Sequence, residues 1–336
     1  MEILLDDIIH ELQKTGGISR YWLELTNRLE RLYSPNELKR INSKSLFVPL
    51  ILSRVCPALI NPFSGREFIF HSSYYRVHAS SRAKNILTVH DFTHRVLGHG
   101  LKDQVFIVQQ TLAIKLASHV ICVSQNTKED LLRFFPSVDS GKISVVYNGV
   151  SDVFFPDFSS RSGNVTQGSQ PYALFIGSRA RHKNFKSAVL SLLSLPVGLV
   201  VAGSERLSNE EIEFLSENLK DRWRFYYFPN SDQLRTLYQG ATCLLYPSGY
   251  EGFGIPVLEA MKCGIPVVAC DNSSVREIAG PSTILVDRPE PELLKNGVIR
   301  ALNGLPQDIL EDGVRYASQF TWDRCFDETL DVYKRV

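Results

Sequence analysis

LLYPSGYEGFGIPVLEAMKCGIPVVAC, residues 244–270, is the stretch around which the chain is organised. The apolar run 241–246 predicts a buried strand of a parallel sheet, and the chain then turns at Pro247. Pro256 suits the first position of a helix and Gly264 suits the residue just past its end, which predicts a helix of about two turns. The amino end of this helix faces a glycine-containing turn at the carboxyl end of a strand, where open α/β sheets bind ligands. We therefore expect a phosphate at this turn.

Two carboxylates flank the turn. Glu251 lies in the loop before the predicted helix and Glu259 lies within its first turn, so the two side chains can meet different parts of one ligand. A carboxylate beside a phosphate is costly unless it accepts hydrogen bonds from hydroxyl groups, and a nucleotide sugar carries hydroxyls on both sides of its pyrophosphate. On the residues alone, a solvated Glu251 and a Glu259 that only complements the helix dipole explain the pattern equally well.

The string PSGYEGFGIPVLEAMKCGIPVVA, residues 247–269, resembles the signature of glycosyltransferase family 4, a family of retaining enzymes with the GT-B fold. The resemblance includes the two glutamates with seven residues between them. It implies that Glu259 holds the ribose of the nucleotide and that Glu251 contacts hydroxyls of the donor sugar. The backbone implied at the sugar and phosphates belongs to Gly252, Phe253, Gly254 and Ile255.

The length and composition of the chain limit the classes of protein to which it can belong. The 336 residues are enough for two domains of ordinary size, and 37 basic residues against 36 acidic ones leave no overall field that would attract nucleic acid. The six cysteines form no C-x-x-C pair, and the opening residues MEILLDDIIH lack the bases of a signal peptide, so we expect a reducing cytoplasm. The apolar stretch 189–203 is too short to cross a bilayer.

The first half of the chain offers two further candidate segments. Gly16 and Gly17 are expected on a turn between a strand at residues 1–5 and a helix from about residue 21 to 32, although a lone glycine pair is more often plain turn chemistry. By resemblance, the glycine pair lies near the donor phosphates and the acceptor.

VHDFTH, residues 89–94, ends a second apolar run. As chemistry, a histidine and an aspartate at the end of a strand form an acid/base pair, a metal half-site or a capped turn, and the capped turn is commonest. No further Cys or His at ligand spacing accompanies them, so we expect no metal. By resemblance, His90 reaches the donor sugar, and we assign Asp91 and His94 to the acceptor side.

Three bases crowd one strand-to-helix turn in the second half. A strand at residues 171–177 ends in GSRARHKNF, and Arg179, Arg181 and Lys183 would repel one another unless they were solvated or an anion lay among them. By resemblance, Lys183 grips the departing pyrophosphate. Ser178 occupies the position that the family most often gives to an arginine. We therefore assign the arginine role to Arg179, with Arg181 second.

Short apolar runs separated by helical patterns predict a parallel, doubly wound sheet in the second half. Together with the resemblance they imply an α/β protein with the GT-B fold, two Rossmann-like domains facing across a cleft. We expect an acceptor-side domain at residues 1–156, a polar loop at 157–170, a nucleotide-sugar-binding domain at 171–318, and a terminal helix at 319–336 that crosses back to the first domain.

With the retaining mechanism that the resemblance implies, we expect a metal-independent glycosyltransferase that needs no cofactor. The chain contains no D-x-D sequence, so Lys183, an arginine and helix N-termini are expected to stabilise the leaving phosphate. GSRARHKNF and SGYEGFG most resemble segments of mannosyltransferases of surface-polysaccharide assembly, which makes GDP-mannose the first choice of donor and a UDP-sugar the second. The alternatives are a UDP-sugar-dependent transferase of the same family and a catalytically weakened sugar-nucleotide-binding protein. A nicotinamide enzyme is disfavoured because neither G-x-G pair has its third glycine.

The acceptor is expected to be a glycan or a lipid-linked molecule, met in the cytoplasm or at the inner face of a membrane. Residues 28–54 hold an excess of bases around the apolar string LFVPLIL, residues 46–52. Such a segment docks on an anionic leaflet, or it is a buried strand with solvated flanks.

Overall fold

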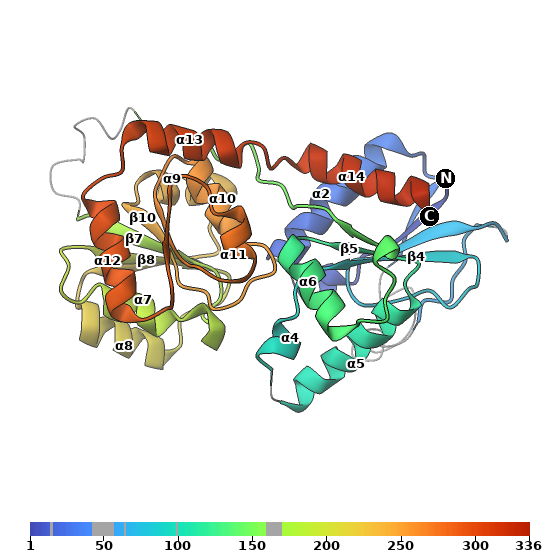
Figure 1. The fold of residues 1–336 in the computed structure, drawn as a ribbon, viewed down its shortest axis with the longest axis horizontal. Helices are drawn as coiled ribbons and strands as arrows, with labels where there is room; N and C mark the ends of the chain where they lie inside the picture. The colour runs from blue at the N-terminus through green and yellow to red at the C-terminus, as the bar shows by residue number, and fades with distance from the viewer. Residues whose placement is uncertain (14–15, 42–56, 64, 99, 159–169) are drawn as a thin grey trace. The chain divides into compact units, whose positions relative to one another are not determined.

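The structure is a computed structural model, and it describes the chain except for residues 14–15, 42–56, 64, 99 and 159–169. The chain divides into two compact units, Met1–Gly149 with Trp322–Val336, and Val150–Thr321. Each unit is built on one six-stranded sheet whose neighbouring strands all pair in parallel. The predicted α/β class is confirmed (Figure 1).

The first unit surrounds a sheet with the strand order β2-β1-β3-β4-β5-β6. The direction of winding reverses between β1 and β3, so this sheet is doubly wound. Its strands are β1 (Ile3–Asp6), β2 (Leu38–Ile41), β3 (Phe68–Ser72), β4 (Ala83–Val89), β5 (His119–Cys122) and β6 (Ile143–Val145). Its helices are α1 (Ile9–Leu12), α2 (Gly17–Leu32), α4 (Thr93–Val96), α5 (Leu101–Leu116), α6 (Gln125–Phe134), the 3-10 turn η2 (Ser140–Lys142) and α14 (Trp322–Arg335).

Helices cover both faces of this sheet, which is why every residue of β1 is buried. Within the unit, α2 and α14 lie together on one face, and α5 and α6 lie on the other (Figure 1). Helix α2 buries Tyr21, Trp22, Leu25 and Leu29, which recur at helical spacing on one side.

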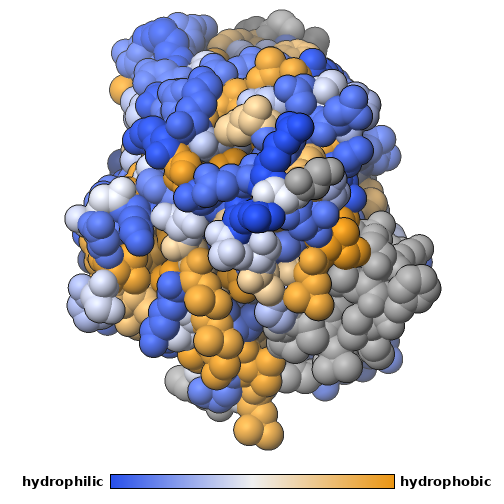
Figure 2. All heavy atoms as spheres, turned by 90° about the vertical axis from the view of Figure 1, so that its right-hand side faces the viewer, coloured by the Kyte–Doolittle hydropathy of each residue, from blue (hydrophilic) through white to orange (hydrophobic). Residues whose placement is uncertain are grey.

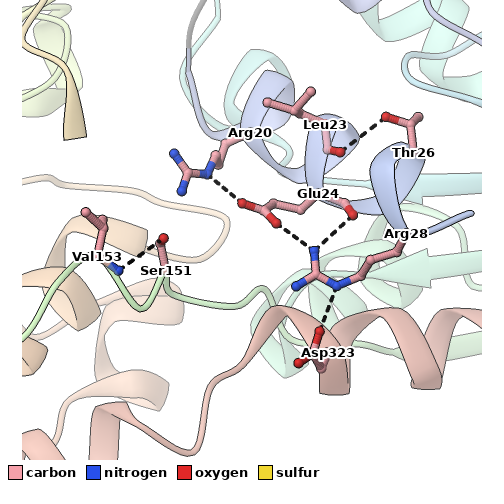
Figure 3. Close-up of polar contacts among 8 residues, drawn as sticks. All are labelled: Arg20, Leu23, Glu24, Thr26, Arg28, Ser151, Val153 and Asp323. Carbon is pink, nitrogen blue, oxygen red and sulfur yellow. Dashed lines mark hydrogen bonds and ion pairs between the residues drawn. The ribbon is translucent and has the colours of Figure 1, made fainter. Parts of the chain in front are cut away.

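The last helix of the chain is therefore part of the first unit. The Nε of Arg28 on α2 donates to Oδ1 of Asp323 on α14 at 2.8 Å, and its Nη1 donates to Oε2 of Glu24 at 2.6 Å (Figure 3). Deeper in, the ring Nδ1 of His71 on β3 lies 2.5 Å from the hydroxyl of Tyr333 on α14, and both residues are buried. The exposed pair contributes little, whereas the buried contact fixes the position of the helix.

The second unit surrounds a sheet with the strand order β12-β11-β10-β7-β8-β9, and its winding reverses between β7 and β10. Its strands are β7 (Tyr172–Ile176), β8 (Gly198–Gly203), β9 (Trp223–Tyr227), β10 (Cys243–Tyr246), β11 (Val267–Cys270) and β12 (Thr283–Val286). Its helices are the 3-10 turn η3 (Arg181–Lys183), α7 (Phe185–Ser191), α8 (Asn209–Leu219), α9 (Ser231–Gln239), α10 (Ile255–Lys262), α11 (Ser273–Ile278), α12 (Pro291–Leu302) and α13 (Gln307–Ala317).

One core of this unit lies between the sheet and helices α7, α8 and α12. Val189, Leu215 and Val298 on these helices pack with Leu199 and Leu245 of the strands, and all five are almost fully buried. This arrangement explains why the strands were predictable as short apolar runs, because a parallel strand covered on both faces is apolar along its whole length.

The boundary between the units falls earlier than residue 156, where the sequence analysis ended the first domain. The first unit ends at Gly149, and residues 150–156 belong to the second unit. Arg235 and Gln239 of α9 hold this segment by donating to the carbonyls of Val153 and Phe155 at 3.2 and 2.8 Å. The predicted polar loop at 157–170 lies almost entirely outside the described residues.

The described cysteines are free and buried. Burial raises the pKa of the Cys122 and Cys243 thiols to about 12, so they pack as small apolar side chains. Among the described residues, no helix combines the length and the apolar character needed to span a membrane.

Candidate functional site

The reversal of winding in the second sheet brings two predicted segments side by side. The turn with the three bases follows β7, and the glycine-rich turn follows its neighbour β10. Because parallel strands end at the same edge of a sheet, both turns lie where open α/β sheets bind ligands. Lys183 comes from the first turn and Glu251 from the second.

Lys183 and Glu251 form an ion pair between Nζ and Oε1, and the two side chains are only 17 and 12% exposed. The Lys183 ammonium also lies 5.6 Å from the centroid of the Tyr246 ring. Burial opposes ionisation of Glu251, but the charge and hydrogen bond of Lys183, with the hydroxyls of Ser248 and Tyr246, hold its pKa below the usual value. The Glu251 side chain is therefore a carboxylate at neutral pH, held beside Lys183.

Hydrogen bonds within the unit join the two turns. Asn184, in the left-handed conformation at φ 51°, donates from Nδ2 to the carbonyl of Pro247 at 2.9 Å. The amide of Gly249 donates to the carbonyl of His182 at 2.8 Å. These bonds hold the positions of Lys183 and the glycine-rich turn relative to each other.

The first turn of α11 supports the glycine-rich turn from the other side. The hydroxyl of Ser273 accepts from the Glu251 amide at 3.0 Å, and the hydroxyl of Ser274 donates to the carbonyls of Glu251 and Phe253, each at 2.9 Å. The backbone that the resemblance assigns to the sugar and phosphates is thus held by two serines.

Helix α10 begins at Ile255, after Gly254 and one residue before the predicted Pro256. The prediction that Glu259 lies in the first turn is therefore wrong, since Glu259 is the fifth residue of the helix. Gly254 has φ 111°, a conformation that side chains with a Cβ rarely adopt, and an added Cβ would lie 3.1 Å from Cδ1 of Ile278. Pro256 has no amide N–H and the Val257 amide donates to the Gly254 carbonyl at 2.9 Å, so the Ile255 amide and the helix dipole are what this amino end offers to an anion.

Glu259 on α10 is positioned by a buried tyrosine. The hydroxyl of Tyr238 on α9 donates to Oε2 of Glu259 at 2.8 Å. Burial and the Glu259 carboxylate raise the pKa of Tyr238 well above its usual value, so the hydroxyl remains a donor. Glu259 is only partly buried.

Arg179 is held by α8 and by the loop before it. Its Nε donates to Oε1 of Glu211 at 2.7 Å and its Nη2 to the carbonyl of Arg206 at 2.8 Å, and its side chain is 5% exposed. Arg181 is exposed in the same turn as Lys183, and Ser178 is partly buried just after β7. This geometry favours Arg181, the second choice, over Arg179 for the arginine role.

In the first unit, the glycine pair lies at the amino end of α2. Gly16 precedes the helix with φ 148°, and Gly17 is its first residue. The prediction that both glycines lie on a turn is therefore wrong for Gly17. The helix starts four residues before the expected Tyr21 because residues 17–20 continue the same hydrogen-bonded spiral, as the bond from the Arg20 amide to the Gly16 carbonyl at 3.0 Å shows.

His90 lies directly after β4, half-buried, with its ring edge-on to Tyr21 at a centroid distance of 5.1 Å. Burial lowers the pKa of His90 to about 4, and the neighbouring Asp91 opposes this only in part. The imidazole is therefore neutral at pH 7 and can donate or accept a hydrogen bond.

We call residues 90–94 the acceptor-side turn. Asp91 accepts from the amide of Thr93 at 2.8 Å, which is the capped-turn alternative of the sequence analysis. His94 lies in α4, where its Nδ1 is 2.7 Å from Oδ1 of Asp103 and its ring stacks on Phe106 at 4.2 Å. Both side chains thus also have structural roles in this turn.

No group of three or more His, Cys, Asp or Glu side chains among the described residues is arranged to hold a metal ion. The sequence reasoning missed Tyr238, Ser273 and Ser274, which position the two glutamates. The Asn-Ser-Ser sequence, residues 272–274, precedes Val275 and Ile278 at helical spacing, and this helix-start signal could have identified the serines. Nothing near Tyr238 in the sequence indicates its partner.

Comparison with known families matches both parts of the chain. The family model of glycosyl transferases group 1 matches residues 158–312, and that of glycosyltransferase family 4 matches residues 50–153. The resemblance stated from residues 247–269 is confirmed.

Individual relatives agree with these matches. The chain is 26% identical to the O-antigen chain mannosyltransferase B of Escherichia coli, over 95% of this chain and 96% of that protein. Among solved structures, sucrose-phosphate synthase of Thermosynechococcus elongatus superposes with a TM-score of 0.76 at 18% identity, over 100% of this chain and 98% of that one. HepE of Anabaena, solved with UDP and glucose, superposes with a TM-score of 0.74 at 18% identity over the whole of both chains. The predicted GT-B fold is confirmed.

Proposed function

Since the chain belongs to the glycosyltransferases, with a family 4 part followed by a group 1 part, we propose that it transfers a sugar from a nucleotide-sugar donor to an acceptor hydroxyl, with retention of configuration and without a metal. The observation that carries this proposal is the Lys183–Glu251 pair, placed beside the amino end of α10 with Glu259 one turn further along. The three groups match a pyrophosphate flanked by hydroxyls on both sides.

Donor binding exchanges the partners of this pair. The pyrophosphate pairs with the ammonium of Lys183, and the hydroxyls of the sugar donate to the carboxylate of Glu251. The bond that breaks joins the sugar to the phosphate, so negative charge grows on the phosphate in the transition state. Lys183, Arg181 and the positive amino end of the α10 dipole stabilise that charge in place of a divalent cation. Glu259, held by Tyr238, binds the ribose.

The first unit supplies the remaining groups of the proposal. The neutral ring of His90 contacts the donor sugar, and the amide backbone at Gly16 and Gly17 faces the phosphates and the acceptor. Asp91 and His94 shape the acceptor side. The leaving phosphate accepts the proton of the acceptor hydroxyl on the face where the new bond forms, so no protein group acts as general base.

GDP-mannose is our first choice of donor and a UDP-sugar the second. The name of the Escherichia coli relative, a mannosyltransferase, supports the first, and HepE with its UDP and glucose supports the second. A thermal-shift panel of GDP-, UDP- and ADP-sugars tests the choice, because a ligand that binds the folded state raises the melting temperature. A shift with GDP and GDP-mannose that is absent with UDP and UDP-glucose is the expected result.

Activity is tested by release of nucleotide diphosphate from the stabilising donor, with and without added acceptor glycans. Release confirms an enzyme, whereas stabilisation without any release or transfer identifies a sugar-nucleotide-binding protein. Chelation with EDTA tests the metal. We expect unchanged turnover after EDTA, and a loss that manganese or magnesium restores would refute the metal-free mechanism.

We also propose a cytoplasmic location with docking at an anionic membrane surface through residues 28–54. The apolar string 46–52 lies outside the described residues, so the support is the sequence itself. Arg28 and Arg40 of this segment are ion-paired with acids. The other bases of the segment are Arg31, Lys39, Lys44 and Arg54, of which the two lysines are the ones to test. The parent should sediment with anionic liposomes, whereas a Lys39→Ala, Lys44→Ala variant should stay in the supernatant.

A further inference from the structure

One face of α5 exposes a row of apolar side chains. Leu101, Val105, Val108, Leu112 and Leu116 follow one another at helical spacing, and each exposes between 55 and 89% of its surface. A solvated helix face is normally polar, and contiguous exposed apolar surface marks a binding surface. Figure 2 shows hydrophobic side chains gathered into a ridge at the lower edge of its view, at the level of α5 in Figure 1.

The row forms one side of a hollow with a volume of about 370 Å³, which we call the α5 hollow. Val105, Val108, Leu112 and Leu116 line it, so it follows the helix for eleven steps from residue 105 to 116, or roughly 16 Å at 1.5 Å per step. Its volume falls within the range of small-molecule sites. The shape suits an extended chain better than a compact ring.

The lining of the hollow indicates an uncharged ligand. Arg76 is its charged member among the described residues, and the Arg76 guanidinium donates to Oδ1 of Asp6 at 2.9 Å, with both side chains fully buried. The charge of Arg76 is thus directed to Asp6. What remains toward the hollow is aliphatic carbon with a few amide and hydroxyl groups, which is the lining that aliphatic chains bind.

The hollow adjoins the acceptor-side turn through Tyr75. Tyr75 lines the hollow, and its hydroxyl donates to the carbonyl of Asp91 at 3.4 Å. Gln110 of α5 donates to the same carbonyl at 3.1 Å and to the Tyr75 hydroxyl at 2.9 Å. The next residue back along the chain is His90, which our proposal places at the reacting sugar.

We propose that the α5 hollow binds the aliphatic chain of a lipid-linked acceptor whose reactive hydroxyl lies at the acceptor-side turn. This inference rests on the proposed function, since it names the acceptor class of that same reaction. It chooses the lipid-linked acceptor over a free glycan because a free glycan has nothing to place along this row.

The test uses the whole chain and a dansyl-labelled fatty alcohol, an uncharged probe kept below the concentration at which it aggregates. Saturable binding is followed by the rise in dansyl fluorescence and by competition with the unlabelled alcohol. Leu112→Asp introduces a charge into the lining, and Leu23→Asp on α2 is the matched control, since the two leucines are 55 and 45% exposed in the same unit and Leu23 lies outside residues 28–54. We expect Leu112→Asp to weaken binding by about tenfold or more and the control to bind as the parent does.

Three outcomes would overturn the inference. The first is equal binding by Leu112→Asp and the parent. The second is a parent dimer in light scattering that Leu112→Asp makes monomeric while the parent binds no probe, which would make this row an interface between two copies. The third is attachment of the parent to vesicles without saturable binding of the dispersed probe. Because the readout needs no donor, failure of the donor-binding and nucleotide-release experiments would be recognised separately. Circular dichroism of each variant checks its fold.

Discussion

At the scale of single residues, Lys183 carries the largest expected effect. Lys183→Ala should lower turnover by more than ~100-fold, because it removes a preorganised charge partner of the leaving phosphate. Lys186→Ala is the matched control, since Lys186 is an exposed lysine on the adjacent helix whose ammonium lies 5.5 Å from the Phe214 ring. Initial rates of nucleotide release compare the two. Similar losses in both variants would show that the effect is one of general charge.

Alanine variants of the two glutamates are expected to differ in binding experiments. Glu259→Ala should weaken binding of the free nucleotide diphosphate and of the donor alike, because the ribose is present in both. Glu251→Ala should lower turnover yet bind the free nucleotide diphosphate at least as tightly as the parent, because Lys183 then has no carboxylate partner to give up. Isothermal titration measures both affinities, and equal losses in the two variants would contradict this division.

The two arginines near β7 are expected to differ as well. Arg179→Ala should lower the free energy of unfolding by about 1 kcal/mol, since it removes a hydrogen-bonded partner of the half-buried Glu211, and it should leave turnover of the folded fraction nearly unchanged. Arg181→Ala should lower turnover and leave the free energy of unfolding nearly unchanged. Urea unfolding and initial rates on the same preparations check this, and a fall in turnover for Arg179→Ala alone would restore it as the phosphate-binding arginine.

At the scale of elements, the start of α10 depends on one glycine conformation. Gly254→Ala should destabilise the fold by about 1–2 kcal/mol through the left-handed backbone, and it should also weaken donor binding because the new Cβ presses on Ile278. Gly304→Ala is the control, with φ 81° and no atom within 4 Å of its added Cβ. It should cost similar stability and leave donor affinity intact. Melting temperature and donor titration separate the two effects.

The same elements show what a sequence can and cannot predict. The strand, turn and helix around Gly254 were predictable because apolar runs, proline and glycine act within a few residues of one another. The ion pair of Lys183 with Glu251 followed in part, since parallel strands place both turns at one edge. The turning of Arg179 toward Glu211 was not predictable, because its partner lies on a helix 32 residues away. The Tyr238 contact to Glu259 is of the same kind.

At the scale of the whole molecule, the buried contact between β3 and α14 should make the stability of the fold depend on pH in acid. Burial lowers the pKa of His71 to about 3, so below its ordinary value of 6.5 the unfolded chain binds a proton that the folded chain does not. Stability from this group therefore falls as the pH falls from about 6.5 toward 3. Asp6 acts oppositely, because burial raises its pKa to about 6.

A difference between two proteins isolates His71 from Asp6. The free energy of unfolding of the parent minus that of His71→Gln should decrease by up to ~1.4 kcal/mol per pH unit below pH 6.5. Both proteins carry Trp223→Phe, so that fluorescence from Trp22 and Trp322 reports the first unit. A difference that does not change between pH 7 and pH 5 would show that His71 is not held neutral.

The return of α14 to the first unit also bears on how the chain acquires its structure during synthesis. The first unit is begun by Met1–Gly149, yet it is completed by Trp322–Val336, which leaves the ribosome only after the whole second unit. At about 5–20 residues per second, Gly149 waits roughly 10–40 s for the helix that covers Tyr21 and His71. The second unit, which is continuous in the chain, can close first. Nascent chains stalled before α14 should therefore be cut by protease in the first unit while the second unit resists.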